Sequence, residues 1–310
     1  MLLALKIDVD TLRGTREGVP HLLDILRRHD AGATFLFSVG PDHTGRAIRR
    51  VFRPGFVDKV QRTSVVRHYG VKTLLYGTLL PGPDIGRRAG DIMRRTRDEG
   101  FEVGVHAWDH VKWQDGLDGA GAEWTAAQMQ RACNRFADVF QEAPHVHGAA
   151  GWQMNVHAMR LTQVLDFAYC SDGRGTHPHW PVWQAELIRC PQLPTTLPTL
   201  DELIGTEGIG EDTVAERLLA LTATPPEAGH VFTLHAELEG MRLAPAFERL
   251  LAGWIAQGYR LVPMRALHET LQPLTLPRCE VAPGSVPGRT GTLLCQGREF
   301  LGDVNLALAA

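Results

Sequence analysis

The sequence predicts an α/β fold in which parallel strands alternate with helices around a (β/α) barrel. Short apolar runs typical of buried strands, such as residues 2–10 and 33–39, are separated by an amphipathic helical segment at 19–29, and this order favours parallel pairing. Polar residues follow several of these runs at their C-terminal ends, where a parallel barrel places its chemistry. The length of 310 residues and the hydrophobic content of 44% suffice for one large α/β domain or two ordinary ones.

The later segments continue this alternation. Each is bounded by glycine, proline or polar residues and has the periodicity of a strand or of an amphipathic helix. We expect helices at 85–99, from 125 onward, at 213–222, 247–257 and 264–270, and strands at 101–105, from 167, at 231–235 and at 259–262.

The first strand ends in two carboxylates, Asp8 and Asp10. Residues two apart in a strand point to the same side, so both can face one site. Two acids at the end of a buried strand are costly to keep ionised without a cation or hydrogen-bond donors nearby. Either they belong to a site that supplies such partners, or one of them only caps the following turn.

Histidines follow two other strands. His106 and His110 come directly after the run at 101–105, and His235 ends the run at 231–235. A spacing of four places both rings on one side of a helical turn, but in a chain with 14 histidines the pair by itself is weak evidence for a metal site. Two histidines and one carboxylate form a triad that leaves positions open on a metal, while a second carboxylate and a separate histidine can take up and donate protons. Jointly, these strand ends predict a metal-dependent amide hydrolase.

Residues 43–83 are basic and apolar. Eight lysines and arginines in this segment, among them Arg49, Arg50 and Arg53, are accompanied by one acid, Asp58, and are interleaved with aromatic and aliphatic residues. This composition is typical of a segment that contacts an anionic membrane surface, with those three arginines as the candidate contacts. The alternative is an ordinary amphipathic insertion whose basic face is solvated.

Composition restricts the other function classes. The net charge of −3 does not favour nucleic-acid binding. The five cysteines are scattered and contain no C-x-x-C pair, which indicates free thiols in a reducing compartment. The apolar N-terminus is too short for a signal peptide, so we expect a cytoplasmic protein. Residues 1–272 are expected to form the catalytic domain, and 273–310, rich in proline and glycine, an irregular tail outside it.

The motifs at these strand ends resemble those of the polysaccharide deacetylase superfamily (NodB homology, carbohydrate esterase family 4). Residues 6–11 resemble its first motif with one residue inserted between the acids, His106–His110 its second, and Thr233–His235 the end of its late strand. The resemblance implies a distorted (β/α) barrel, with Asp8 as catalytic base and His235 as general acid. It also implies a divalent metal (zinc, manganese or cobalt) on Asp10, His106 and His110.

Longer segments resemble one branch of this superfamily, the deformylases of aminoarabinose lipid A modification. They are residues 8–20, 37–42, 171–175 and 233–240. The resemblance implies removal of formate from a formamido-arabinose carried on undecaprenyl phosphate, at the cytoplasmic face of the inner membrane, in a pathway that confers polymyxin resistance. Trp152, Asp172 and Glu237 are predicted to contact the substrate. The alternatives are a soluble-sugar N-deacetylase of the same superfamily, a metal-free amidase and a non-catalytic membrane-surface module.

One motif departs from the superfamily pattern. The third motif normally carries an arginine that holds the catalytic aspartate, but the corresponding turn, Gly148–Trp152, has none. We expect Arg174, in the small-residue loop at 171–175, to supply that charge to Asp8.

Overall fold

The computed structural model describes residues 1–47 and 71–302. Arg49, Arg50 and Arg53 lie outside the described residues. In chain order the elements are β1 (Leu2–Val9), η1 (Gly14–Gly18), α1 (Val19–Arg28), β2 (Thr34–Ser38), η2 (Thr44–Ala47), α4 (Val71–Leu75), α5 (Ile85–Asp98), β3 (Glu102–Ala107), α6 (His110–Gly116), α7 (Ala122–Phe140), β4 (Val146–His147), η3 (Ala150–Trp152), α8 (Val156–Val164), β5 (Tyr169–Cys170), β6 (Trp180–Trp183), β7 (Glu186–Leu187), α9 (Leu200–Leu203), α10 (Val214–Leu221), β8 (His230–His235), α11 (Ala244–Ala256), β9 (Arg260–Val262), α12 (Met264–His268), β10 (Arg278–Gly284) and β11 (Leu293–Glu299).

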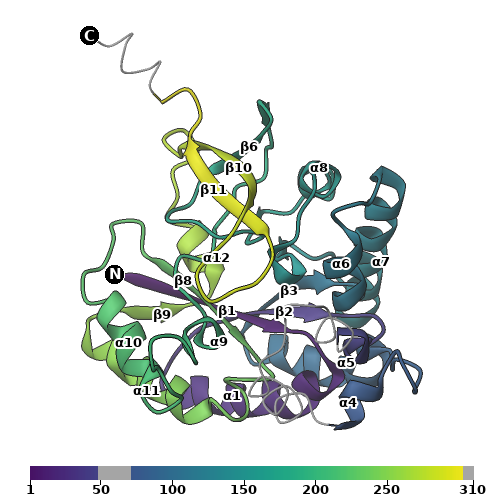
Figure 1. Ribbon diagram of the computed structural model, residues 1–310, viewed down its shortest axis with the longest axis horizontal. Helices are drawn as coiled ribbons and strands as arrows, with labels where there is room; N and C mark the ends of the chain where they lie inside the picture. Colours follow the sequence, from purple (N-terminus) through teal and green to yellow (C-terminus); the bar gives the residue numbers. More distant parts are fainter. Residues whose placement is uncertain (48–70, 303–310) are drawn as a thin grey trace.

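A curved parallel sheet forms the centre of the molecule (Figure 1). Its strand order is β5-β4-β3-β2-β1-β8, and β9 also pairs with β1. The helices that connect successive strands pack on its outside, which gives the distorted (β/α) barrel expected from the sequence. Because all these pairings are parallel, the C-terminal ends of β1, β3 and β8 meet at the same rim.

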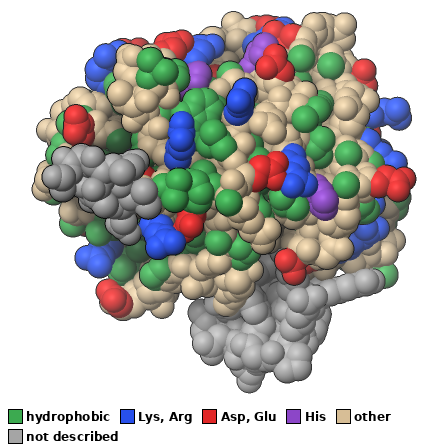
Figure 2. Space-filling view, turned by 90° about the horizontal axis from the view of Figure 1, so that it is seen from above, with side chains coloured by type: hydrophobic (Ala, Val, Ile, Leu, Met, Phe, Trp, Pro, Cys, Tyr) green, Lys and Arg blue, Asp and Glu red, His purple; other side chains and the backbone are tan. Residues whose placement is uncertain are grey.

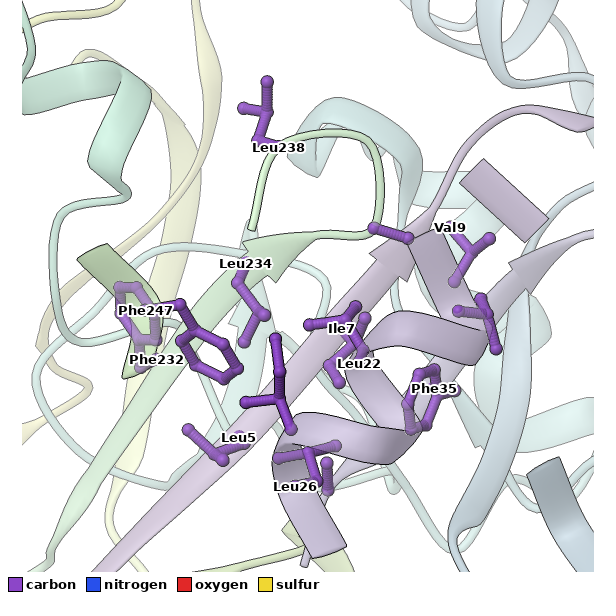
Figure 3. Packing of buried hydrophobic residues seen from close by; sticks show 14 of the residues in the cluster. Leu5, Ile7, Val9, Leu22, Leu26, Phe35, Phe232, Leu234, Leu238 and Phe247 are labelled. Atoms are coloured by element: carbon purple, nitrogen blue, oxygen red, sulfur yellow. The ribbon is translucent and has the colours of Figure 1, made fainter. Parts of the chain in front are cut away.

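The alternation of side chains along β1 separates the core from the site. Leu5, Ile7 and Val9 point outward and pack with residues of α1, β2, β8 and α11 in the main hydrophobic cluster (Figure 3). Residues of the opposite parity face the barrel interior, where Ala4 joins a smaller apolar cluster. Lys6, Asp8 and Asp10 have this inward parity, so their positions follow from the packing of the outer face.

Residues 278–299 form two strands and a turn, so the expectation of an irregular tail was wrong for this part of the chain. Strands β10 and β11 pair antiparallel and extend a second sheet of order β11-β10-β6-β7. Two glycines of this segment, Gly288 and Gly291, lie in the connecting turn and adopt positive φ angles of 77° and 85°. The apolar residues flanking the turn, Val281, Leu293 and Leu294, are buried and hold the hairpin against the barrel.

The surface is of mixed charge. On the face shown in Figure 2, acidic and basic side chains are interspersed among apolar and neutral areas. Within residues 1–47 and 71–302, no helix combines the length and the apolar character needed to cross a bilayer.

Candidate active site

Asp10, His106 and His110 come together at the rim of the barrel. Asp10 follows β1, His106 lies near the end of β3, and His110 is the first residue of α6, whose N-cap Asp109 accepts a hydrogen bond from the Lys112 amide at 3.1 Å. The Asp10 carboxylate is 3.2 Å from Nε2 of His106 and 3.5 Å from Nε2 of His110. The candidate ligand atoms of these three residues lie within 4.8 Å of one another, so the predicted cluster is present.

The chemistry of this cluster fits a cation. Nδ1 of His106 is 2.7 Å from the carbonyl oxygen of Gly148 and donates to it, which directs Nε2 toward Asp10. Oδ1 of Asp10 is buried and has no hydrogen-bond partner among the described residues. Without a proton or a metal ion between them, two lone pairs would face each other. Burial raises the pKa of Asp10, but the charges of His110 and His106 outweigh it and lower that pKa, so the carboxylate is an ionised ligand.

Asp8 lies beside this cluster with a cation of its own. Its Oδ2 is 3.4 Å from Nζ of Lys6, a side chain with no exposed surface that also donates to the carbonyl oxygen of Ser171 at 3.1 Å. Oδ1 of Asp8 is buried and has no hydrogen-bond partner among the described residues. One oxygen is therefore held by Lys6, while the other is available as a proton acceptor.

The expected pair of Arg174 with Asp8 does not form between these described residues. Both Oε atoms of Glu202 accept hydrogen bonds from Nη1 of Arg174, at 2.6 and 2.9 Å, and the Leu197 carbonyl accepts one from Nη2 at 3.0 Å. The charge expected from Arg174 comes instead from Lys6. The sequence carried a signal for it, because Lys6 is two residues before Asp8 in a strand and therefore shares its face.

His235 faces the same rim from the neighbouring strand, where it is directly paired with Asp8 in the register of β1 and β8. Burial lowers the pKa of His235, but the negative charges of Asp201 and Asp10 outweigh it and raise that pKa to about 9. Its Nδ1 has no hydrogen-bond partner among the described residues. At neutral pH the ring is a protonated donor. Asp201 was not identified from the sequence, because no local pattern links the start of α9 to β8.

The three residues predicted to contact the substrate are buried. Trp152 is 1% exposed and donates from its indole nitrogen to Thr195. Asp172 is fully buried beside His147. Glu237 is 2% exposed, and its Oε1 accepts from the amide of Asp10 at 3.1 Å and from the amide and hydroxyl of Thr11. As placed here, these side chains offer a substrate almost no surface, and Glu237 instead fixes the chain that carries Asp10.

Comparisons with known proteins show the family of this chain. Residues 4–156 match the family model described as polysaccharide deacetylase. The chain is 38% identical over 291 residues to a protein of Shewanella sediminis (strain HAW-EB3), named probable 4-deoxy-4-formamido-L-arabinose-phosphoundecaprenol deformylase ArnD, with 93% of this chain and 92% of that protein covered. A protein of the same name from Wigglesworthia glossinidia brevipalpis is 30% identical over 91% of this chain and 98% of its own.

The fold is also found in a solved structure. A putative polysaccharide deacetylase from Mycobacterium smegmatis superposes with a TM-score of 0.62 at 18% sequence identity, covering 92% of this chain and 94% of that chain. This likeness extends beyond the 153 residues that the family model matches.

Proposed function

This chain belongs to the polysaccharide deacetylase family of amide hydrolases, and we propose that it is a metal-dependent deformylase. Its substrate would be 4-deoxy-4-formamido-L-arabinose carried on undecaprenyl phosphate, the compound in the names of the two relatives described above. The proposal rests mainly on one observation. The ionised carboxylate of Asp10 and the rings of His106 and His110 cluster at the rim of the barrel. Asp8 and His235 lie beside this cluster on neighbouring strands.

Asp10, His106 and His110 would hold the metal ion, and zinc, manganese and cobalt all suit this donor set. When bound, a divalent cation supplies Lewis acidity, which makes water a better nucleophile at neutral pH and polarises an amide carbonyl. The hydrogen bond from His106 to Gly148 orients the ring, and Glu237 orients the chain at Asp10. Both contacts hold the ligand atoms in place before a metal arrives.

The remaining residues move protons. Water adds to the formyl carbon, and its proton passes to the unpartnered Oδ1 of Asp8, while Lys6 holds Oδ2. The bond between the carbonyl carbon and the sugar nitrogen then breaks. His235 donates a proton to the departing nitrogen, and its raised pKa keeps that proton available at neutral pH. The products are formate and the free amino sugar.

The proposal places the enzyme at the cytoplasmic face of the inner membrane, where its product would enter lipid A modification. Residues 43–83 would contact the anionic lipid surface through Arg49, Arg50 and Arg53. The parts of this segment that the structure describes support this location. His43 forms a hydrogen bond at 2.6 Å with Asp109, which lies between His106 and His110 in the sequence. Leu79 is 81% exposed. Replacing the three arginines by glutamate should abolish sedimentation with anionic vesicles, and unchanged sedimentation would contradict the membrane assignment.

The test of the activity is formate release from the formamido-sugar lipid. We expect turnover that a chelator abolishes and that added zinc, manganese or cobalt restores. The matched acetamido-sugar lipid serves as the comparison, because a soluble-sugar deacetylase would prefer the acetyl group and would not need the lipid. Release of acetate at the higher rate, or formate release that persists after the metal is removed, would contradict the proposal.

A further inference from the structure

The turn between β10 and β11 lies against the barrel beside α9 (Figure 1). A Cβ atom at Gly288 would stand 2.0 Å from the carbonyl oxygen of Glu202, so only glycine allows the turn to approach this closely. On the other side of the turn, Gln153 donates to the carbonyl oxygen of Thr292. These contacts fix the position of the residue that follows Gly288, which is Arg289.

Arg289 is an arginine with uncommitted donors. Its guanidinium carbon lies 4.6 Å from the ring centroid of Trp152, and the Arg174 guanidinium carbon lies 5.1 Å from that ring. It forms an ion pair with Glu202 at 3.7 Å, which is longer than a hydrogen bond. The side chain is 21% exposed, and among the described residues its guanidinium forms no hydrogen bond. None of its unpaired nitrogen atoms is fully buried, so these N–H donors reach solvent and can bind an acceptor.

The charges around this side chain favour an anion. Two guanidinium groups, those of Arg174 and Arg289, share the single carboxylate of Glu202, which already binds Arg174 through both oxygens. These three side chains together carry one excess positive charge in a partly buried position, where the attraction to an oxyanion is stronger than in bulk water. The Asp201 carboxylate also lies within electrostatic range of Arg289.

Arg289 is linked to both proton-transfer groups through intervening side chains. Lys6, which pairs with Asp8, has its Nζ 5.3 Å from the same Trp152 ring. Asp201, whose charge raises the pKa of His235, is also within electrostatic range of Arg289. The Trp152 ring and the Lys6 ammonium thus lie between the Arg289 guanidinium and Asp8. The Asp201 carboxylate lies between the guanidinium and His235.

We infer that Arg289 binds the phosphate that joins the sugar to its lipid carrier, so that the C-terminal hairpin is part of the active site and selects a phosphate-bearing substrate. The inference rests on the proposed function. It assigns to the hairpin a role in specificity, since a planar guanidinium can donate two parallel hydrogen bonds to a phosphate.

Two soluble probes separate phosphate binding from general effects. One is the methyl phosphodiester of 4-deoxy-4-formamido-L-arabinose, and the other is its neutral methyl glycoside. For Arg289→Ala in the full-length, metal-loaded protein, we expect kcat/KM on the phosphodiester to fall about 10- to 100-fold, mainly through a higher KM. The neutral glycoside should be hydrolysed as fast as by the wild type. Arg289→Lys should restore part of the loss, because it retains the charge.

A matched control lies on the same hairpin. Arg298 is 76% exposed and paired with Glu280 at the surface, so Arg298→Ala should leave both substrates unaffected. Equal losses on the two probes for Arg289→Ala, or no loss on either, would overturn the inference while leaving the deformylase assignment intact. If the wild type releases formate from neither probe nor from the lipid substrate, the proposed function fails, and this inference fails with it.

Discussion

Two clusters within residues 1–47 and 71–302 contain the residue types that bind metals, but they differ in burial, hydrogen bonding and protonation. The first is Asp10, His106 and His110, and the second is His147, Cys170 and Asp172, at the ends of β4 and β5. The first is accessible, with His110 and Asp10 side chains 19% and 11% exposed. The second is completely enclosed, because Asp172 and Cys170 have no exposed surface.

Hydrogen bonding separates the two clusters more sharply than burial does. In the second cluster, Oδ1 of Asp172 accepts from Nδ1 of His147 at 2.7 Å and from the Ala149 amide at 3.0 Å, and Oδ2 accepts from Gln192 at 3.0 Å. In the first cluster, Oδ1 of Asp10 has no such partner among the described residues. A carboxylate with all its acceptors occupied is part of the structure, whereas one with a buried free oxygen needs a ligand.

The protonation of Cys170 also argues against a metal ion in the second cluster. Burial, the contact with Cys190 and the charge of Asp172 all raise the pKa of the Cys170 thiol well above its usual value. A thiol binds metal as the thiolate, so this cysteine is a poor ligand. Residue identity and proximity therefore do not define a metal site. A metal site needs ligand atoms that are ionised, that have no other hydrogen-bond partner, and that a substrate can approach.

The largest effect should follow from Asp10→Asn. Asparagine retains the shape of the side chain but removes the charge that offsets the cation, so formate release should fall about 1,000-fold or more. Metal content, measured in the same preparation, should fall with it, while the far-UV circular dichroism stays that of the folded protein. Full activity in this variant would show that the first cluster is not the metal site.

Asp172→Asn tests whether the second cluster has a structural role. It breaks a buried pair and should lower the free energy of unfolding by about 3 kcal/mol, measured by chemical denaturation, without loss of metal from the folded fraction. Burial raises the pKa of Asp172, but the His147 charge and the hydrogen bonds outweigh it and lower that pKa.

The sign of the pH dependence follows. A lowered pKa in the folded protein contributes stability above the unfolded value of 3.8, and this contribution is lost as the pH falls through the folded value. The stability difference between wild type and Asp172→Asn should therefore be constant near neutral pH and shrink below about pH 4. A difference that does not change with pH would show that Asp172 is not ionised in the folded protein.

The residues of the first cluster could be predicted from the sequence, but the contacts of the side chains around it could not. Asp8, Asp10, His106 and His235 were identifiable because parallel strands bring their C-terminal ends to one rim, whatever the length of chain between them. Arg174 was assigned to Asp8 because it stands in a polar loop, but a loop position does not specify which way a long side chain turns. Glu202, which binds it, belongs to a helix that no motif connects with that loop.

The C-terminal hairpin illustrates a different limit. Its prolines and glycines indicated irregular chain, yet the pairing of β10 with β6 joins segments about a hundred residues apart. Local composition carries little information on such long-range pairing. The sequence shows that Val281 and Leu294 are apolar, but only their pairing in the folded protein shows that they are buried in a core. Arg289 was missed for the same reason.

The central claim is that the first cluster holds the metal and that this metal is required for turnover. It is tested most directly by titrating metal-free protein with zinc while recording formate release, in the wild type and in Cys170→Ala. We predict that activity rises linearly and levels off at one equivalent in both proteins, since the second cluster binds no metal. Turnover at zero equivalents, or a plateau that is lost in Cys170→Ala, would contradict the account.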